Sequence, residues 1–183
     1  MEKDRRIRKV VFRILMISGF CLLGISCHYH AMIGKSDLKT ISQECIEESG
    51  TEKIIKNGDY SLILREGDEG FAVFLQNGKG IVGSQELPAW ITVRGSDTLP
   101  TGEYIETDYK QPYYQVIRKK YGFCATASVN TEKGSVFIVE DKYTLLKDGV
   151  FGIYRDVKVK EARAEDVGFA STISFQTGRS EER

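Results

Sequence analysis

The chain has 183 residues, enough for one domain with a sizeable core, and its 26 basic and 26 acidic residues give a formal net charge of zero. Residues 1–26 hold six basic and two acidic residues, so the remainder has 20 basic and 24 acidic residues, a net charge of −4. A mildly acidic body argues against a nucleic-acid partner, because a nucleic-acid surface needs clustered Lys and Arg.

Residues 1–27 are organised like an export signal. A basic segment at residues 5–13 precedes twelve mainly apolar residues at 14–25, fewer than the roughly 20 that a membrane-spanning helix needs. The segment ends in LGISC, which resembles the bacterial lipobox, although Gly24 stands where leucine is usual. We expect a signal helix, lipidation of Cys27 and a lipid-anchored location in the cell envelope, in the periplasm or at the outer membrane. An ordinary signal peptide and a short signal anchor are the alternatives.

Residues 28–57 are predicted to form a tether, with a possible short helix over residues 36–46, where apolar residues recur at roughly helical spacing. The only two histidines lie at its start without further ligands nearby, so we expect no metal site. Cys45 and Cys124 remain after the signal. Export would permit a disulfide between them, but we favour two unpaired cysteines, with Cys124 packed as a small hydrophobe.

Residues 58–177 alternate apolar and polar side chains in short runs separated by Gly-rich turns, which predicts strands with one buried face. About nine strands are expected, at residues 60–65, 71–76, 79–82, 87–93, 113–119, 121–129, 135–146, 150–160 and 168–175. Residues 101–111 are polar and predicted to form a loop, and residues 178–183 a polar tail. The fold class is therefore all-β, an antiparallel β-sandwich.

The sequence offers no self-contained active site. Residues 78–83 match the G-x-G-x-x-G pattern of dinucleotide-binding proteins, but Pro88 follows too soon for the helix that this site requires, so we expect no cofactor. Glu140 and Asp141 are adjacent on a predicted strand and face opposite ways, so they are unable to act as a catalytic pair. We therefore predict no catalytic residues.

Aromatic residues gather in the middle of the chain. Trp90, Tyr113 and Tyr114 are candidates for contacting a carbohydrate, because planar rings stack on sugars. The alternative is that these rings fill the core of the sandwich, as Tyr and Trp commonly do.

A sequence pattern in the second half of the chain carries a family resemblance. Asp141-Lys142-Tyr143 ends one predicted strand, residues 149–159 follow the pattern G-x-F-x-I-x-R-x-V-x-V, and residues 168–171 read G-F-x-S. This pattern resembles the N-terminal β-supersandwich of bacterial six-hairpin glycosidase-like proteins, over roughly residues 58–176 and most clearly after Tyr113. Arg155 falls on the inward face of its strand and would need a partner there.

The resemblance implies a role in carbohydrate metabolism without catalysis by this chain alone. In that family the sandwich is followed by an α/α barrel that carries the catalytic carboxylates, whereas this chain ends just after the strand that begins at Gly168. We therefore expect an exported, supersandwich-like domain of a glycoside-hydrolase-like protein, with a C-terminal catalytic domain as a possible partner. The alternative is a standalone cell-envelope lipoprotein that binds a glycan or a protein.

Overall fold

The structure, a computed structural model, describes residues 45–78, 80–146 and 150–175. Every described residue belongs to one compact unit. The predicted signal, Cys27 and the two histidines therefore lie outside the described residues. No helix within the described ranges is long and apolar enough to cross a membrane.

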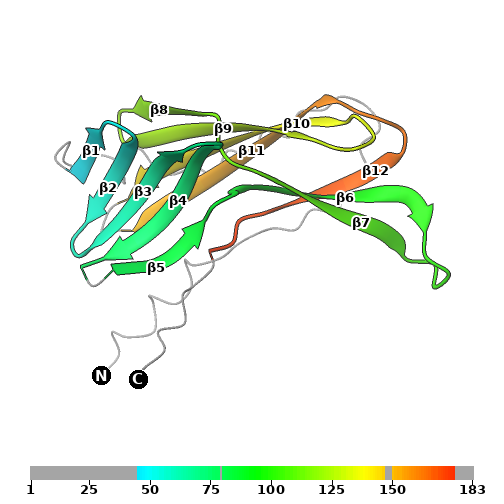
Figure 1. Ribbon diagram of the computed structural model, residues 1–183, viewed down its shortest axis with the longest axis horizontal. Coiled ribbons are helices and arrows are strands. Elements are labelled where there is room, and N and C mark those ends of the chain that lie inside the picture. Colours follow the sequence, from blue (N-terminus) through cyan, green and yellow to red (C-terminus); the bar gives the residue numbers. More distant parts are fainter. Residues whose placement is uncertain (1–44, 79, 147–149, 176–183) are drawn as a thin grey trace, which may run out of the picture. The chain divides into compact units, whose positions relative to one another are not determined.

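The prediction of an all-β, antiparallel sandwich is confirmed, with twelve strands in the described residues rather than about nine (Figure 1). The five-stranded sheet has the order β1-β2-β3-β4-β5, with bounds Ile46–Ser49, Glu52–Asn57, Tyr60–Gly67, Gly70–Asn77 and Gly80–Gln85. The four-stranded sheet has the order β11-β10-β9-β8, with bounds Phe151–Glu161, Val136–Leu145, Gly122–Asn130 and Gln115–Lys119. The three-stranded sheet has the order β12-β6-β7, with bounds Asp166–Thr172, Ala89–Thr98 and Tyr104–Gln111.

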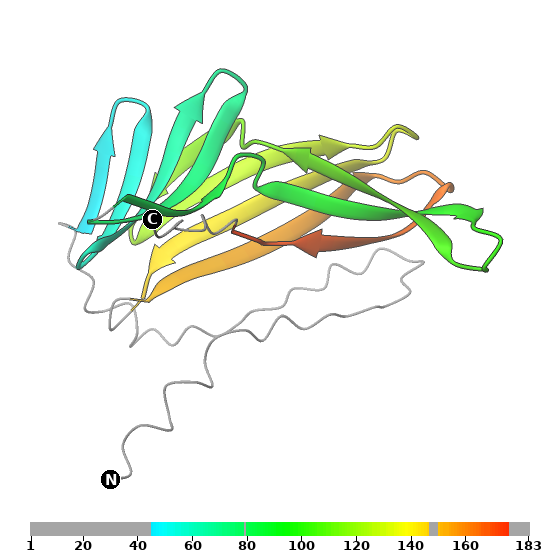
Figure 2. The same cartoon turned by 60° about the horizontal axis from the view of Figure 1, so that its bottom comes forward.

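The core lies between the four-stranded sheet and the other two sheets. Strand β10 contacts β2 and strand β8 contacts β4 of the five-stranded sheet, while β9 contacts β6 and β7 of the three-stranded sheet. Figure 2 shows the five-stranded and three-stranded sheets following one another along the long strands β9, β10 and β11. One cluster of buried apolar side chains draws members from all three sheets, for example Leu64, Ile91 and Val139. Burial of this shared face drives the sheets together.

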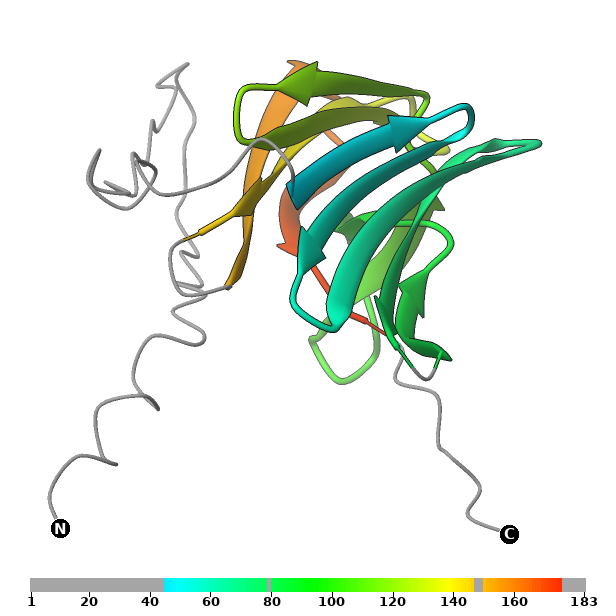
Figure 3. The same cartoon turned by 90° about the vertical axis from the view of Figure 1, so that its left-hand side faces the viewer.

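The first two strands correct the predicted tether. Residues 46–57 belong to the predicted tether, and Ile46 alone to its possible helix, yet Ile46 begins β1, and β1 and β2 extend the first sheet (Figure 3). Ile46 and Ile55 lie opposite each other in the ladder and are both buried in the core. Pairing across a short turn places these two isoleucines on one face, where burial stabilises both strands.

Strand β7 corrects the predicted loop at residues 101–111. Seven of its eight side chains are exposed, so the segment lacks the apolar alternation that marks a half-buried strand. It is held instead by its backbone ladder to β6 and by cross-strand pairs on the outer face. Arg94 bonds Glu106 at 3.0 Å, and Thr92 bonds Asp108 at 2.7 Å.

Candidate functional site

An ion pair between Asp141 and Arg155 lies at the centre of the most unusual group of side chains in the described residues. The two residues are direct cross-strand neighbours on β10 and β11. Arg155 Nε lies 2.7 Å from Asp141 Oδ1, and Nη2 lies 2.5 Å from Oδ2, which makes the pair bidentate. The Asp141 side chain is 0% exposed and that of Arg155 is 7% exposed, so both charges are removed from water.

The remaining donors of Arg155 bind the three-stranded sheet. Nη1 donates to Ser171 Oγ at 3.2 Å and to Thr172 O at 2.6 Å, and Nη2 donates to Pro88 O at 2.8 Å. With the two bonds to Asp141, all five guanidinium N–H groups have an acceptor. Burial alone lowers the pKa of Arg155, but the hydrogen bond and charge of Asp141 outweigh it and raise the pKa. The arginine therefore remains charged.

Two tyrosines complete the network on the other side of Asp141. The Tyr113 hydroxyl donates to Asp141 Oδ2, and the Tyr113 and Tyr143 hydroxyl oxygens lie 2.6 Å apart. Because Tyr113 uses its proton on the carboxylate, Tyr143 must donate to Tyr113. The pKa of Tyr113 is raised well above 10 by burial first and then by Tyr143 and Asp141, and burial followed by Asp141 raises the pKa of Tyr143. Both phenols are therefore held protonated.

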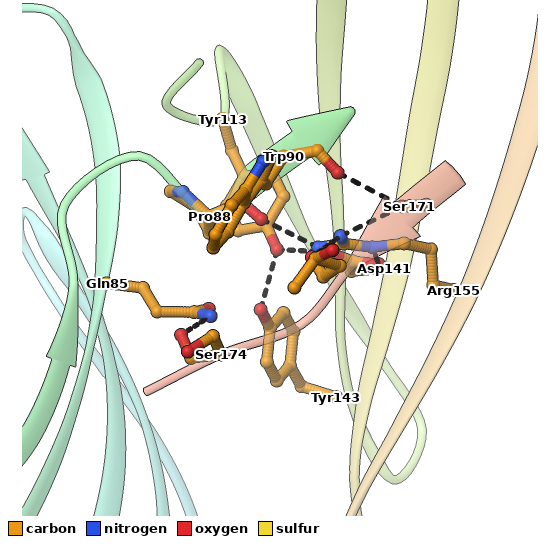
Figure 4. Close-up of polar contacts among 10 residues, drawn as sticks. Gln85, Pro88, Trp90, Tyr113, Asp141, Tyr143, Arg155, Ser171 and Ser174 are labelled. Carbon is orange, nitrogen blue, oxygen red and sulfur yellow. Dashed lines mark hydrogen bonds and ion pairs between the residues drawn. The ribbon is translucent and has the colours of Figure 1, made fainter. Parts of the chain in front are cut away.

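This polar network joins all three sheets (Figure 4). Asp141, Tyr143 and Arg155 belong to the four-stranded sheet, while Ser171 belongs to β12 of the three-stranded sheet. The backbone of Tyr113 pairs with Phe71 of β4, through bonds of 2.7 Å and 3.1 Å. Ser171 Oγ also donates to Trp90 O at 3.2 Å, a side-chain bond that adds to the backbone ladder between β12 and β6. The network thus fixes the sheets relative to one another at one buried point.

The network has no free group with which to perform chemistry. Both oxygens of Asp141 accept bonds from Arg155, one of them also accepts from Tyr113, and the charge is balanced within the pair. A general base or nucleophile needs an accessible lone pair near a space for substrate, which these buried atoms lack. No group of three His, Cys, Asp or Glu side chains that could hold a metal occurs in the described ranges.

The aromatic candidates for carbohydrate contact do not form one exposed platform. Tyr113 is completely buried and uses its hydroxyl in the network, so it is unable to stack on a sugar in this structure. Trp90 is partly buried, and Lys110 Nζ lies 3.8 Å from the centre of its ring. Tyr114 is 60% exposed. For Tyr113 the alternative of a place in the core is therefore confirmed, and carbohydrate contact is the wrong assignment. The sequence does not show which of two adjacent tyrosines points inward.

Two other predictions concern the cysteines and the glycine-rich segment. Cys124 is buried in β9 with a free thiol, so it does not pair with Cys45, and burial, followed by the charge of Glu140, raises its pKa. The G-x-G-x-x-G segment coincides with β5, apart from Gly78 in the preceding turn and residue 79, which lies outside the described residues. No helix begins at Gly83, which is the structural feature that a dinucleotide site requires.

Sequence reasoning found part of the network and missed the rest. The apolar alternation of β11 placed Arg155 inward, and Asp141 and Tyr143 belong to the motif that carried the resemblance. The hydrogen bonds of Ser171 and the backbone acceptor at Pro88 were not foreseen. Ser171 is the last residue of the G-F-x-S pattern, which was the one available signal for its role.

The chain was compared with protein-family models, with curated proteins and with solved structures, and it matches none of them.

Proposed function

We propose that this chain is an exported, lipid-anchored β-sandwich domain of a glycoside-hydrolase-like protein that acts in carbohydrate metabolism, and that it is not catalytic on its own. The single observation that carries the proposal is the convergence of the motif residues. The polar side chains of the three sequence patterns, Asp141, Tyr143, Arg155 and Ser171, all meet in one buried network.

The convergence supports a structural role for the motif. Residues that are far apart in the chain are joined by hydrogen bonds that use every N–H of Arg155 and both oxygens of Asp141. A motif that specifies the packing of three sheets is what a scaffold domain requires. The same saturation supports the absence of catalysis at this point, since a reacting group would have to break the network first.

The coding DNA that follows the codon for Arg183 tests the proposed domain role. We expect it to continue in frame into helical hairpins that carry paired carboxylates, because the resembling proteins place their catalytic barrel there. An immediate stop codon followed by an unrelated gene would contradict the domain proposal. It would favour the standalone cell-envelope lipoprotein instead.

The proposed lipid anchor predicts a specific effect of Cys27→Ser. Cells that express the full chain should incorporate labelled fatty acid into it and retain it in the membrane fraction. Cys27→Ser should abolish the label, because the thiol is the site of acylation. Cys21→Ser is the matched control and should leave the label unchanged, since this cysteine lies within the apolar part of the signal. Equal labelling of both variants would contradict the assignment.

A further inference from the structure

Strand β12 is an unprotected edge. It pairs with β6 on one side only, and no other strand of the described residues pairs with its second side. Residues 167–172 contain no charged residue and no proline. Val167 is 52% exposed and Phe169 is 46% exposed. An uncharged edge with exposed apolar side chains is a template for pairing with another strand.

Most other sheet edges in the described residues carry features that discourage pairing. Strand β1 is four residues long and contains two glutamates, and β8 is five residues long and contains Arg118 and Lys119. Strands β7 and β11 present several charges each. Strand β5 is uncharged, but its ladder to β4 is irregular after Leu75. On β12 the one charged residue is Asp166, at its first position, where the register also shifts. Edge protection is therefore weakest at β5 and β12, and of these two strands β12 is the one with an exposed aromatic ring, that of Phe169.

We propose that the free edge of β12 pairs in antiparallel orientation with β12 of a second copy of this chain, about a two-fold axis at Phe169. In this register Phe169 lies opposite its own counterpart, and Gly168 lies opposite Ala170 of the second copy. Asp166 then lies opposite Thr172, so no like charges meet across the axis. The pairing is isologous, as a two-fold dimer requires.

The inner face of β12 gives the pairing an apolar contribution. Phe169 is the ladder partner of buried Val93, so it lies on the inward side of the sheet. Its ring packs against that of buried Phe137, with centroids 5.0 Å apart. Pairing through β12 would place two such aromatic pairs side by side and remove the exposed parts of both Phe169 rings from water. This inference does not depend on the proposed function, because either version of that proposal permits a dimer.

Sedimentation of the full chain in detergent, over a range of concentrations, tests the pairing. The wild type should form dimers, and Ala170→Lys should raise the dissociation constant at least tenfold, because it places a lysine on each of two adjacent strands. Ala170 is exposed on the outer face, so the monomer should accommodate the change. Thr107→Lys, on the opposite edge of the same sheet, is the control and should leave the dimer intact.

A second variant guards against a folding defect in Ala170→Lys. Gly168→Lys should also weaken the dimer at least tenfold, and a Cβ at Gly168 would meet no atom within 4 Å. A monomeric wild type at all concentrations would overturn the proposal. So would a dimer that both β12 variants leave unchanged, because the association would then arise elsewhere in the chain.

Discussion

At the scale of single residues, Asp141 and Arg155 form the most deeply buried ion pair in the described residues. Removing two charges from water costs several kcal/mol per ion, and only good geometry with further hydrogen bonds offsets this cost. The bidentate pair, the bonds from Arg155 to Thr172 and Pro88, and the Tyr113 hydroxyl provide these bonds. The buried ion pair is therefore stable only when all of these hydrogen bonds are made.

Loss of one partner should be severe. Arg155→Met should lower the free energy of unfolding by about 3–5 kcal/mol, because Asp141 would be left charged and buried. Urea denaturation of the full chain measures the change. Lys158→Met on the same strand is the control and should stay within about 0.5 kcal/mol, since its side chain is 64% exposed. Equal effects of the two substitutions would contradict the role of Arg155.

The two buried tyrosines predict a loss of stability in alkali. Their pKa values in the folded state are raised above the unfolded value of about 10, so the folded state keeps its protons longer. The stabilisation is complete below about pH 10 and declines above it, by up to about 1.4 kcal/mol per pH unit for each tyrosine.

Denaturation as a function of pH checks this decline. The double variant Tyr113→Phe/Tyr143→Phe should show a shallower decline above about pH 10 than the wild type, because both titrating groups are gone. Tyr114→Phe is the control and should decline like the wild type, since Tyr114 is 60% exposed and outside the network. A double variant that declines as steeply as the wild type would show that the two phenols do not control the transition.

At the scale of elements, the meander of β9, β10 and β11 positions the network. Strand β10 has buried side chains at every second position, and its neighbours fix the register of Asp141 against Arg155. Gly122 begins β9 beside Tyr143, and a Cβ at this glycine would overlap the Tyr143 carbonyl oxygen. The register near Tyr143 thus depends on a residue without a side chain.

Gly122→Ala should therefore destabilise the fold by about 3 kcal/mol, because the backbone of β10 has to move away from the new methyl group. Gly78→Ala is the matched control and should stay within about 0.5 kcal/mol, since a Cβ there meets nothing within 4 Å. Thermal unfolding compares the two. A Gly122→Ala protein as stable as the control would show that the β9–β10 register is not constrained at this point.

The alternation of apolar and polar residues made some strands predictable from the sequence, whereas strands without it were not predicted. The sequences of β9, β10 and β11 alternate apolar and polar residues, which predicted the three strands and placed Arg155 inward, although in the structure only β10 alternates in burial along its whole length. Strand β7 was missed because nearly all of its side chains are exposed, and it is held by its backbone ladder and by cross-strand pairs that the sequence does not reveal. The meeting of Tyr113 with Asp141 was beyond prediction, since it depends on the packing of three sheets that no local pattern specifies.

At the scale of the folded sandwich, one buried network couples three sheets. The apolar core also spans the sheets, but only the network supplies directional bonds between β11, β12 and the segment before β6. A domain coupled in this way should unfold as one cooperative unit. Without Arg155, two hydrogen bonds would still join the three-stranded sheet to the segment after β9, from Thr131 Oγ1 to Asp166 Oδ2 and from Glu132 N to the Tyr109 hydroxyl. The sheet would lose its bonds to β11 and should separate first.

The most direct test follows urea unfolding of the full chain with two probes. Trp90 is the only tryptophan and lies in the three-stranded sheet, so its fluorescence reports that sheet, while far-ultraviolet circular dichroism reports all strands. We predict coincident transitions in the wild type, and in Arg155→Met a fluorescence transition that precedes the loss of circular dichroism. The contradicting result is that the two probes also coincide in Arg155→Met, with both midpoints lowered equally relative to the wild type. The network would then not couple the sheets.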